Sequence, residues 1–298
     1  MDKVGIARGL FYYYYGDIWK KFFDELNVEY EISPRTNRQI MDMGLKKAND
    51  EMCLSLKTYL GHICYLKDRC TYLLVPRICN YNSSNQTCTN FWAIYDIVNN
   101  LFDKKVLTYN IDLDKKETLK KGLFRIGTTL GKSKLDIKKA YIKAMKHYYD
   151  NRKKLIDDNY KRLNSKKVKI LIVSHPYNTY DDMIGGNIVK YLKSNDIEVI
   201  FSDRFDTFKN SGVKLSKDLY FKYSKESLGG IVKSYDKIDG IIFVSSFPCA
   251  PDSLVNELVI RKIKKPCINI IIDESEAFTA LETRLESFID MIRRNAYV

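Results

Sequence analysis

The segment "KVKILIVSHP" (Lys167–Pro176) decides the fold class of this 298-residue chain. Its continuous apolar run is typical of a strand that is covered on both faces. Residues 177–195 follow with apolar side chains at helical spacing, and a second apolar run, "IEVIFS" (Ile197–Ser202), comes next. Strand, helix and strand in this order form the building block of a parallel sheet. The segment therefore predicts an α/β domain.

Further apolar runs extend this pattern in both halves of the chain. Two of them follow in the second half, at residues 239–246 and 266–273, with helical spacing at 251–265 and 280–295. The first half opens in the same way: "KVGIAR" (Lys3–Arg8) precedes an aromatic-rich helical stretch and a second strand at residues 28–33. Another strand is expected at "TYLLVPRI" (Thr71–Ile78). The apolar runs therefore predict one parallel sheet in each half of the chain.

The middle of the chain differs from both halves. Residues 115–162 are dense in Lys, Tyr and Leu, contain no strand-like run, and include a long stretch with helical spacing. We therefore predict an α/β fold with two Rossmann-like parallel-sheet domains, residues 1–110 and 166–298, joined by a helical segment at 111–165.

Composition and charge restrict the function only loosely. The net charge of +13, from 50 Lys and Arg against 37 Asp and Glu, is compatible with a nucleic acid, an acidic protein or a phosphate-bearing coenzyme A thioester. No nucleic-acid-binding motif accompanies the charge, so nucleic acid is the least favoured partner. No stretch reaches the roughly 18 apolar residues of a membrane span, and the N-terminal segment is too polar for a secretory signal. We expect a cytoplasmic protein without a membrane partner.

The seven cysteines divide into two groups by their positions. The odd number and the absence of a C-x-x-C pair argue against a zinc ribbon or a thioredoxin site. Cys249 lies between Pro248 and Pro251, after an apolar run and before a helix, while Cys53 begins an apparent helix and Cys88 lies in a loop. Three loop thiols of this kind suit an iron–sulfur cluster, and the alternative for each is a small buried apolar residue.

The buried alternative is sufficient for Cys64, Cys70 and Cys267, whereas the role of Cys79 stays open.

Other polar residues lie at the predicted carboxyl ends of strands, where parallel sheets collect their ligands. His175 ends the strand that opened this section, and it is a candidate proton donor or a structural histidine. Asp273 and Glu274 end the last strand, and either is a candidate catalytic carboxylate or the cap of the next helix. His175, Asp273 and Glu274 are therefore the candidate catalytic residues.

Several rare strings in one order show a family resemblance that covers most of the chain. They are "KVGIARGLFYYYYGDIWKKFFDELNVEYEISPRTNRQIMDMG", "DEMCLSLKTYLGHI", "YLLVPRI", "CTNF", "SHPYNTYD", "DGIIFVSSFPCAPDS" and "IDESEAFTALETRLESFIDMI". Through them the chain resembles the coenzyme A-enzyme activase-related branch of the 2-hydroxyacyl-CoA dehydratase and benzoyl-CoA reductase superfamily. Proteins of this superfamily carry a cubane or a double-cubane cluster and receive electrons from a separate ATP-hydrolysing activator.

The resemblance implies both a cofactor and partners. The positions that match the family's cluster ligands are Cys53, Cys88 and Cys249, and the cluster is a 4Fe–4S cubane or an 8Fe–9S double cubane. It implies an ATP-hydrolysing iron–sulfur activator as partner, a CoA thioester or another small molecule as substrate, and a homodimer or hetero-oligomer. The expected activity is that of an iron–sulfur reductase or a 2-hydroxyacyl-CoA dehydratase, in ATP-coupled low-potential electron transfer.

The chain departs from the family pattern at three places. Ser55 stands where the family has proline, Leu60 stands where it has an aromatic residue, and the loop after Glu274 is shorter and lacks a histidine and a glycine-rich turn. The shortened loop favours a second function class, a non-catalytic scaffold or accessory subunit that docks an activator or a partner subunit. No phosphate-binding G-x-x-x-x-G-K-[ST] motif is present in the chain.

Overall fold

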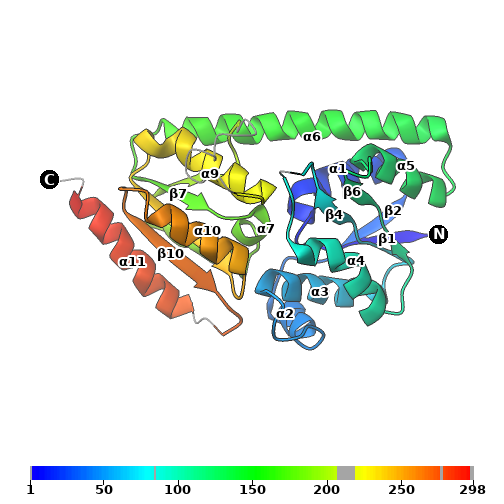
Figure 1. The fold of residues 1–298 in the computed structure, drawn as a ribbon, viewed down its shortest axis with the longest axis horizontal. Helices are drawn as coiled ribbons and strands as arrows, with labels where there is room; N and C mark the ends of the chain where they lie inside the picture. Colours follow the sequence, from blue (N-terminus) through cyan, green and yellow to red (C-terminus); the bar gives the residue numbers. More distant parts are fainter. Residues whose placement is uncertain (1, 84, 207–218, 276–277, 296–298) are drawn as a thin grey trace. The chain divides into compact units, whose positions relative to one another are not determined.

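The computed structural model describes residues 2–83, 85–206, 219–275 and 278–295, which form two compact units. Met1–Arg152 and Tyr220–Lys222 make up the first unit, and Lys153–Leu219 and Tyr223–Val298 make up the second. Helix α6 (Lys134–Leu163) belongs to both units, so the predicted helical segment 111–165 is divided between them. The predicted fold class is confirmed, because both units are α/β with parallel sheets (Figure 1).

The second unit is built on a four-stranded parallel sheet with the order β10–β9–β7–β8. Its strands are β7 (Lys169–Val173), β8 (Glu198–Phe201), β9 (Gly240–Ser246) and β10 (Cys267–Ile272). All seven residues of β9 are buried, which explains its continuous apolar run. The four strands predicted in this half are therefore confirmed.

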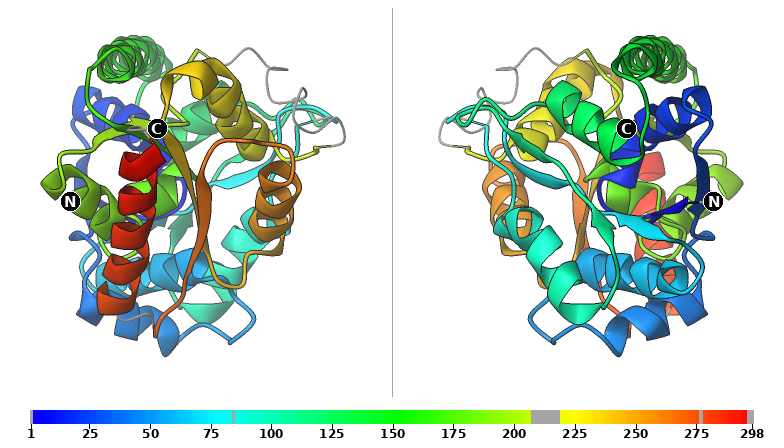
Figure 2. Two further views of the ribbon diagram at one scale, coloured as in Figure 1. Left: turned by 90° about the vertical axis from the view of Figure 1, so that its left-hand side faces the viewer. Right: turned by 90° about the vertical axis from the view of Figure 1, so that its right-hand side faces the viewer.

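Helices cover both faces of this sheet (Figure 2). They are α7 (Pro176–Thr179), α8 (Gly186–Ser194), α9 (Lys222–Ser234), α10 (Ala250–Ile260) and α11 (Phe278–Asn295), with a short 3-10 helix at Tyr235–Lys237. On one face, α9 and α10 share a buried cluster with alternate residues of β7 and β9. On the other face, α11 approaches so closely that a Cβ added to Gly240 would lie 2.4 Å from Ile292 Cδ1.

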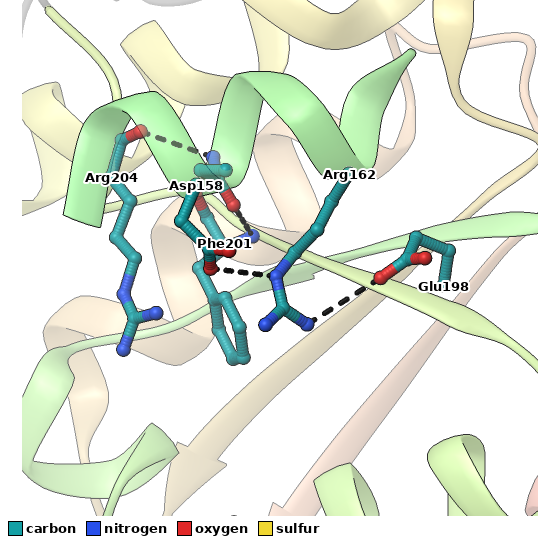
Figure 3. A network of polar contacts seen from close by, with 6 residues as sticks. Asp158, Arg162, Glu198, Phe201 and Arg204 are labelled. Carbon is teal, nitrogen blue, oxygen red and sulfur yellow. Dashed lines mark hydrogen bonds and ion pairs between the residues drawn. The ribbon is translucent and has the colours of Figure 1, made fainter. Parts of the chain in front are cut away.

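Helix α6 is tied to the outer strand β8 by a polar network (Figure 3). Arg162 donates to Asp158 Oδ2 at 2.8 Å and to Glu198 Oε1 at 3.4 Å. Beside it the fully buried side chain of Asn159 hydrogen-bonds the backbone of Phe201 and Arg204, just where β8 ends. The network fixes the loop that leaves the carboxyl end of β8.

The first unit has a parallel sheet of order β2–β1–β3–β5 and a parallel pair β4–β6. The strands are β1 (Lys3–Ile6), β2 (Glu29–Ile32), β3 (Tyr72–Leu74), β4 (Arg77–Asn80), β5 (Val106–Leu107) and β6 (Asn110–Asp112). The single strand expected at 71–78 is divided into β3 and β4 at Pro76, because proline has no N–H to donate to the ladder. Its neighbours still bond across, from Val75 N to Leu107 O at 2.9 Å and from Arg77 N to Tyr109 O at 2.8 Å.

Five helices complete the described part of the first unit, in addition to its share of α6. They are α1 (Tyr12–Glu25), α2 (Arg38–Leu45), α3 (Leu54–Lys67), α4 (Thr89–Leu101) and α5 (Leu119–Thr129). Helices α2 and α3 pack backbone to backbone: a Cβ on Gly44 would lie 2.0 Å from Lys57 O, and one on Gly61 would lie 2.0 Å from Ile40 O. Two glycines therefore set the depth of this contact.

Candidate functional site

Cys53, Cys88 and Cys249 each occupy the position immediately before a helix. They are the N-cap residues of α3, α4 and α10, with ψ angles of 152°, 144° and 95°, and none of the three side chains caps its helix. All three are partly exposed. The first peptide N–H groups of a helix carry partial positive charge, which stabilises a thiolate at this position. Each of the three loop cysteines is therefore at a place that favours a metal-binding thiolate.

The remaining four cysteines have a different environment, because burial raises the pKa of every one of their thiols. The four are Cys64, Cys70, Cys79 and Cys267. Cys79, which sequence reasoning left open, lies in β4 near Asp112, whose negative charge raises the pKa further. These thiols are protonated at neutral pH, which disfavours them as metal ligands.

The three N-cap cysteines are distributed over both units, Cys53 and Cys88 in the first and Cys249 in the second. Among the residues that the structure describes, no three His, Cys, Asp or Glu side chains form a group that could hold a metal ion. The three donors fit an iron–sulfur cluster in chemical type only, because thiolates are the usual cluster ligands.

The second unit has a crevice where an open parallel sheet is expected to bind ligands. From β7 the chain proceeds to β8 on one side and returns to β9 on the other, so the direction of winding changes between β7 and β9. Ligands collect beyond the carboxyl ends of the strands at such a switch point. His175 follows β7 and precedes α7, and Cys249 and α10 follow β9. The sequence placed both residues at a carboxyl end but could not give the strand order.

His175 is held in this crevice by a carboxylate and two aromatic rings. Its Nε2 lies 2.8 Å from Asp252 Oδ1, and the two side chains are only 12% and 11% exposed. The Tyr177 ring stacks on the imidazole at 4.9 Å with an interplanar angle of 14°, and the Tyr223 ring meets it edge-on at 6.1 Å. Because three side chains from α7, α9 and α10 contact it, the imidazole has one defined orientation.

A small cavity of about 20 Å³ adjoins the pair. Its polar lining includes Ser224 and Ser227 of α9 and Asp252 and Asn256 of α10, together with His175. Ser227 donates to Ser174 O at 3.4 Å, whereas Ser224 Oγ and Asp252 Oδ2 are buried and have no hydrogen-bond partner among the described residues. A buried polar atom without a partner is uncommon and requires an explanation.

Asp252 and Ser224 were missed by sequence reasoning. The signal available for Asp252 was its place in the first turn of a helix, three residues after Cys249, which alone suggests only a favourable interaction with the helix dipole. Ser224 carried no signal, because its nearness to His175 depends on how α9 packs against the sheet.

The other two candidate catalytic residues lie at the end of β10. Asp273 Oδ1 accepts hydrogen bonds from the backbone N and the Oγ of Ser275, at 2.8 and 2.9 Å, while Glu274 is exposed. Neither lines the cavity beside His175. Arg284, in the helix that follows, donates to Asn269 O at 2.9 Å. The shortened loop lies partly outside the described residues, at 276–277, and the catalytic role of Asp273 and Glu274 stays a prediction.

The fold and these residues define a two-unit α/β protein with a polar crevice at a switch point and cysteines at three helix starts. A family model described as "CoA enzyme activase uncharacterised domain (DUF2229)" matches residues 3–205, which is more than half of the chain. The chain belongs to this family. The match confirms the predicted resemblance at the level of a CoA-enzyme activase-related protein; it includes Cys53, Cys88 and His175, and it ends before Cys249 and Asp252.

Comparison with curated proteins gave no match. Two solved structures that align with the chain are glucosamine-6-phosphate deaminase from Thermotoga maritima and a sugar transporter from Clostridium phytofermentans. Both are 8% identical to it. The first alignment covers 92% of this chain and 76% of the deaminase with a TM-score of 0.23; the second covers 98% and 93% with a TM-score of 0.20. Scores this low support no argument about fold or function.

None of the helices within the described ranges combines the length and the apolar character needed to cross a bilayer.

Proposed function

We propose that the chain is an iron–sulfur protein that takes part in ATP-coupled low-potential electron transfer with a separate ATP-hydrolysing activator. Its proposed cluster, a 4Fe–4S cubane or an 8Fe–9S double cubane, is held by Cys53, Cys88 and Cys249. The observation that carries the proposal is the division of the seven cysteines: three thiols lie at helix starts, and the other four lie elsewhere and have a pKa that burial raises.

The chain's own residues have defined tasks in this proposal. Each N-cap cysteine offers a thiolate whose negative charge is stabilised by the peptide dipoles of the helix that follows it. When bound, the cluster supplies one-electron chemistry that side chains lack. His175, fixed by Asp252 at the crevice of the second unit, is the proposed proton-transfer residue for the reduction.

Membership of a CoA-enzyme activase-related family supports the partner and the substrate class in the proposal. The partner is the activator that provides the electron, and the substrate is a CoA thioester or another small molecule. The proposed protein works as a reductase or a 2-hydroxyacyl-CoA dehydratase, in a homodimer or a hetero-oligomer.

The test is the iron and acid-labile sulfide content of anaerobically purified, reconstituted protein. We expect about four irons per chain for a cubane-sized complement. Cys53→Ala, Cys88→Ala and Cys249→Ala should each lose most of the iron, whereas the control Cys64→Ala should retain it, because the Cys64 thiol is protonated and half-buried.

Folded wild-type protein that contains no iron after reconstitution would contradict the proposal and favour a cluster-free docking partner of the activator. Equal loss of iron in Cys64→Ala would contradict the assignment of the ligands.

A further inference from the structure

Two of the buried polar atoms of the second unit that have no partner among the described residues lie in the cavity beside His175. Asp252 and Ser224 are only 8% and 6% exposed, and Asp252 Oδ2 and Ser224 Oγ have no hydrogen-bond partner among the described residues. Leaving a buried acceptor unsatisfied costs about 1–3 kcal/mol, and more for a charged group. Two such atoms in one place therefore indicate a ligand.

We propose that the β7–β9 crevice is a water-binding site in which Asp252 acts as the positioning residue of His175. A single water molecule donates hydrogen bonds to Asp252 Oδ2 and to Ser224 Oγ. The other carboxylate oxygen, Oδ1, accepts a hydrogen bond from the N–H at Nε2 of His175. The water site requires neither the proposed cluster nor the activator, so an experiment that refutes it would leave the proposed function untouched, and the reverse also holds.

The size and the lining of the adjoining cavity suit this ligand. Its volume is about 20 Å³, and a water molecule needs roughly 10–15 Å³ measured in this way, with two to four polar partners. Asp252 and Ser224 provide two acceptors, and both residues line the cavity. At about 20 Å³ the cavity has space for about one such molecule. A small neutral hydrogen-bond donor is therefore the ligand class.

The hydrogen bond at 2.8 Å determines which nitrogen of His175 carries the proton. A carboxylate can only accept, so the neutral imidazole has its hydrogen on Nε2 and an acceptor lone pair on Nδ1. Tyr177, stacked on one face of the ring, helps to hold the plane of the imidazole in this orientation. Asp252 thereby makes Nδ1 the proton-accepting atom of the crevice, without itself contacting a substrate.

The tautomer is tested by long-range 1H–15N NMR on full-length protein labelled at its three histidines. His175→Gln assigns the signals. We expect the Nε2–H pattern for His175 in the wild type, a shift toward a mixture of tautomers in Asp252→Ala, and no change in the control Asp236→Ala, whose side chain is exposed. A wild-type Nδ1–H pattern, or an Nε2–H pattern that Asp252→Ala leaves unaltered, would overturn the positioning role. A wild-type Nδ1–H pattern refutes the positioning role even where Asp252→Ala fails to fold.

The water is tested by a high-resolution crystal structure of the full chain. We expect one density peak within hydrogen-bond distance of Asp252 Oδ2 and Ser224 Oγ, and its loss in Ser224→Val, which removes one partner and fills the cavity. A wild-type cavity without density, or a peak that contacts neither atom, would refute the water site.

Discussion

Asn159 offers the sharpest test of the packing between α6 and β8 in the second unit. Its side chain is 0% exposed, and its Nδ2 donates to Phe201 O at 3.1 Å and to Arg204 O at 3.0 Å. Its Oδ1 accepts from Phe201 N at 3.0 Å. Asn159→Ala removes all three hydrogen bonds. Since β8 is the last strand of the described sheet, no neighbouring strand can supply a new acceptor to Phe201 N.

The expected loss of stability in Asn159→Ala follows from the backbone groups that are left buried without a hydrogen-bond partner. Phe201 O keeps a hydrogen bond from Arg204 N at 3.2 Å, so the main losses are the partners of Phe201 N–H and Arg204 C=O. A buried group that loses its partner costs about 1–3 kcal/mol, so two of them should lower the free energy of unfolding by about 3 kcal/mol. Asn159→Asp should cost at least as much, because its carboxylate would face two carbonyl oxygens.

The assay combines urea denaturation with hydrogen exchange in peptides that contain β8, because a chain of two units need not unfold in a single step. The control is Asn164→Ala, whose exposed side chain accepts a single hydrogen bond from Lys237 at 2.8 Å, and it should change stability by less than about 0.5 kcal/mol. A loss below about 1 kcal/mol in Asn159→Ala, with unchanged exchange in β8, would refute the reasoning.

Two further predictions concern the first unit. Gly61→Ala should lower the free energy of unfolding by several kcal/mol in urea denaturation, because its Cβ would meet Ile40 O at 2.0 Å and push α2 away from α3. The control Gly131→Ala, in open space but at a φ of +72°, should lower it by only about 1 kcal/mol. Equal losses in the two variants would contradict this prediction. Burial, aided by the charge of Arg8, lowers the pKa of His62 from 6.5 to about 3, so the unfolded chain takes up a proton that the folded chain excludes. The free energy of unfolding should therefore fall as the pH drops from 6.5 toward 3, by up to about 1.4 kcal/mol per pH unit. His62→Gln should make this pH dependence weaker, whereas the exposed control His147→Gln should leave it unchanged.

The strands with long apolar runs could be predicted from the sequence, and the short ones could not. Strand β9 is buried along its whole length, so every residue is selected for burial and the run is unmistakable. Strands β5 and β6 span two and three residues, too few to establish a period, and they exist because β3 and β4 offer them hydrogen-bond partners. Tertiary pairing, which no local pattern encodes, creates these strands.

The candidate site was predictable to the extent that it depends on neighbours in sequence. The proline-framed Cys249 and the strand-ending His175 are visible in single strings, and both lie at carboxyl ends of strands as expected. The pairing of His175 with Asp252, 77 residues apart, depends on β7 and β9 being adjacent in the sheet. Strand order is decided by the packing of helices on both faces, so the second half of the site emerges only in three dimensions.

The hydrogen bonds of the acidic residues in the second unit separate a positioning role for Asp252 from an ordinary structural one. Asp181 is 1% exposed, and its Oδ1 accepts from the backbone N of Met183 and of Ile184, at 3.0 and 3.2 Å, which secures a turn. Asp273 accepts from Ser275 in the same manner. Asp252 lies in the first turn of α10, yet its Oδ1 is directed at an imidazole from another element and its Oδ2 has no protein partner in the described chain. Its orientation toward His175 is the feature that the proposed positioning role explains.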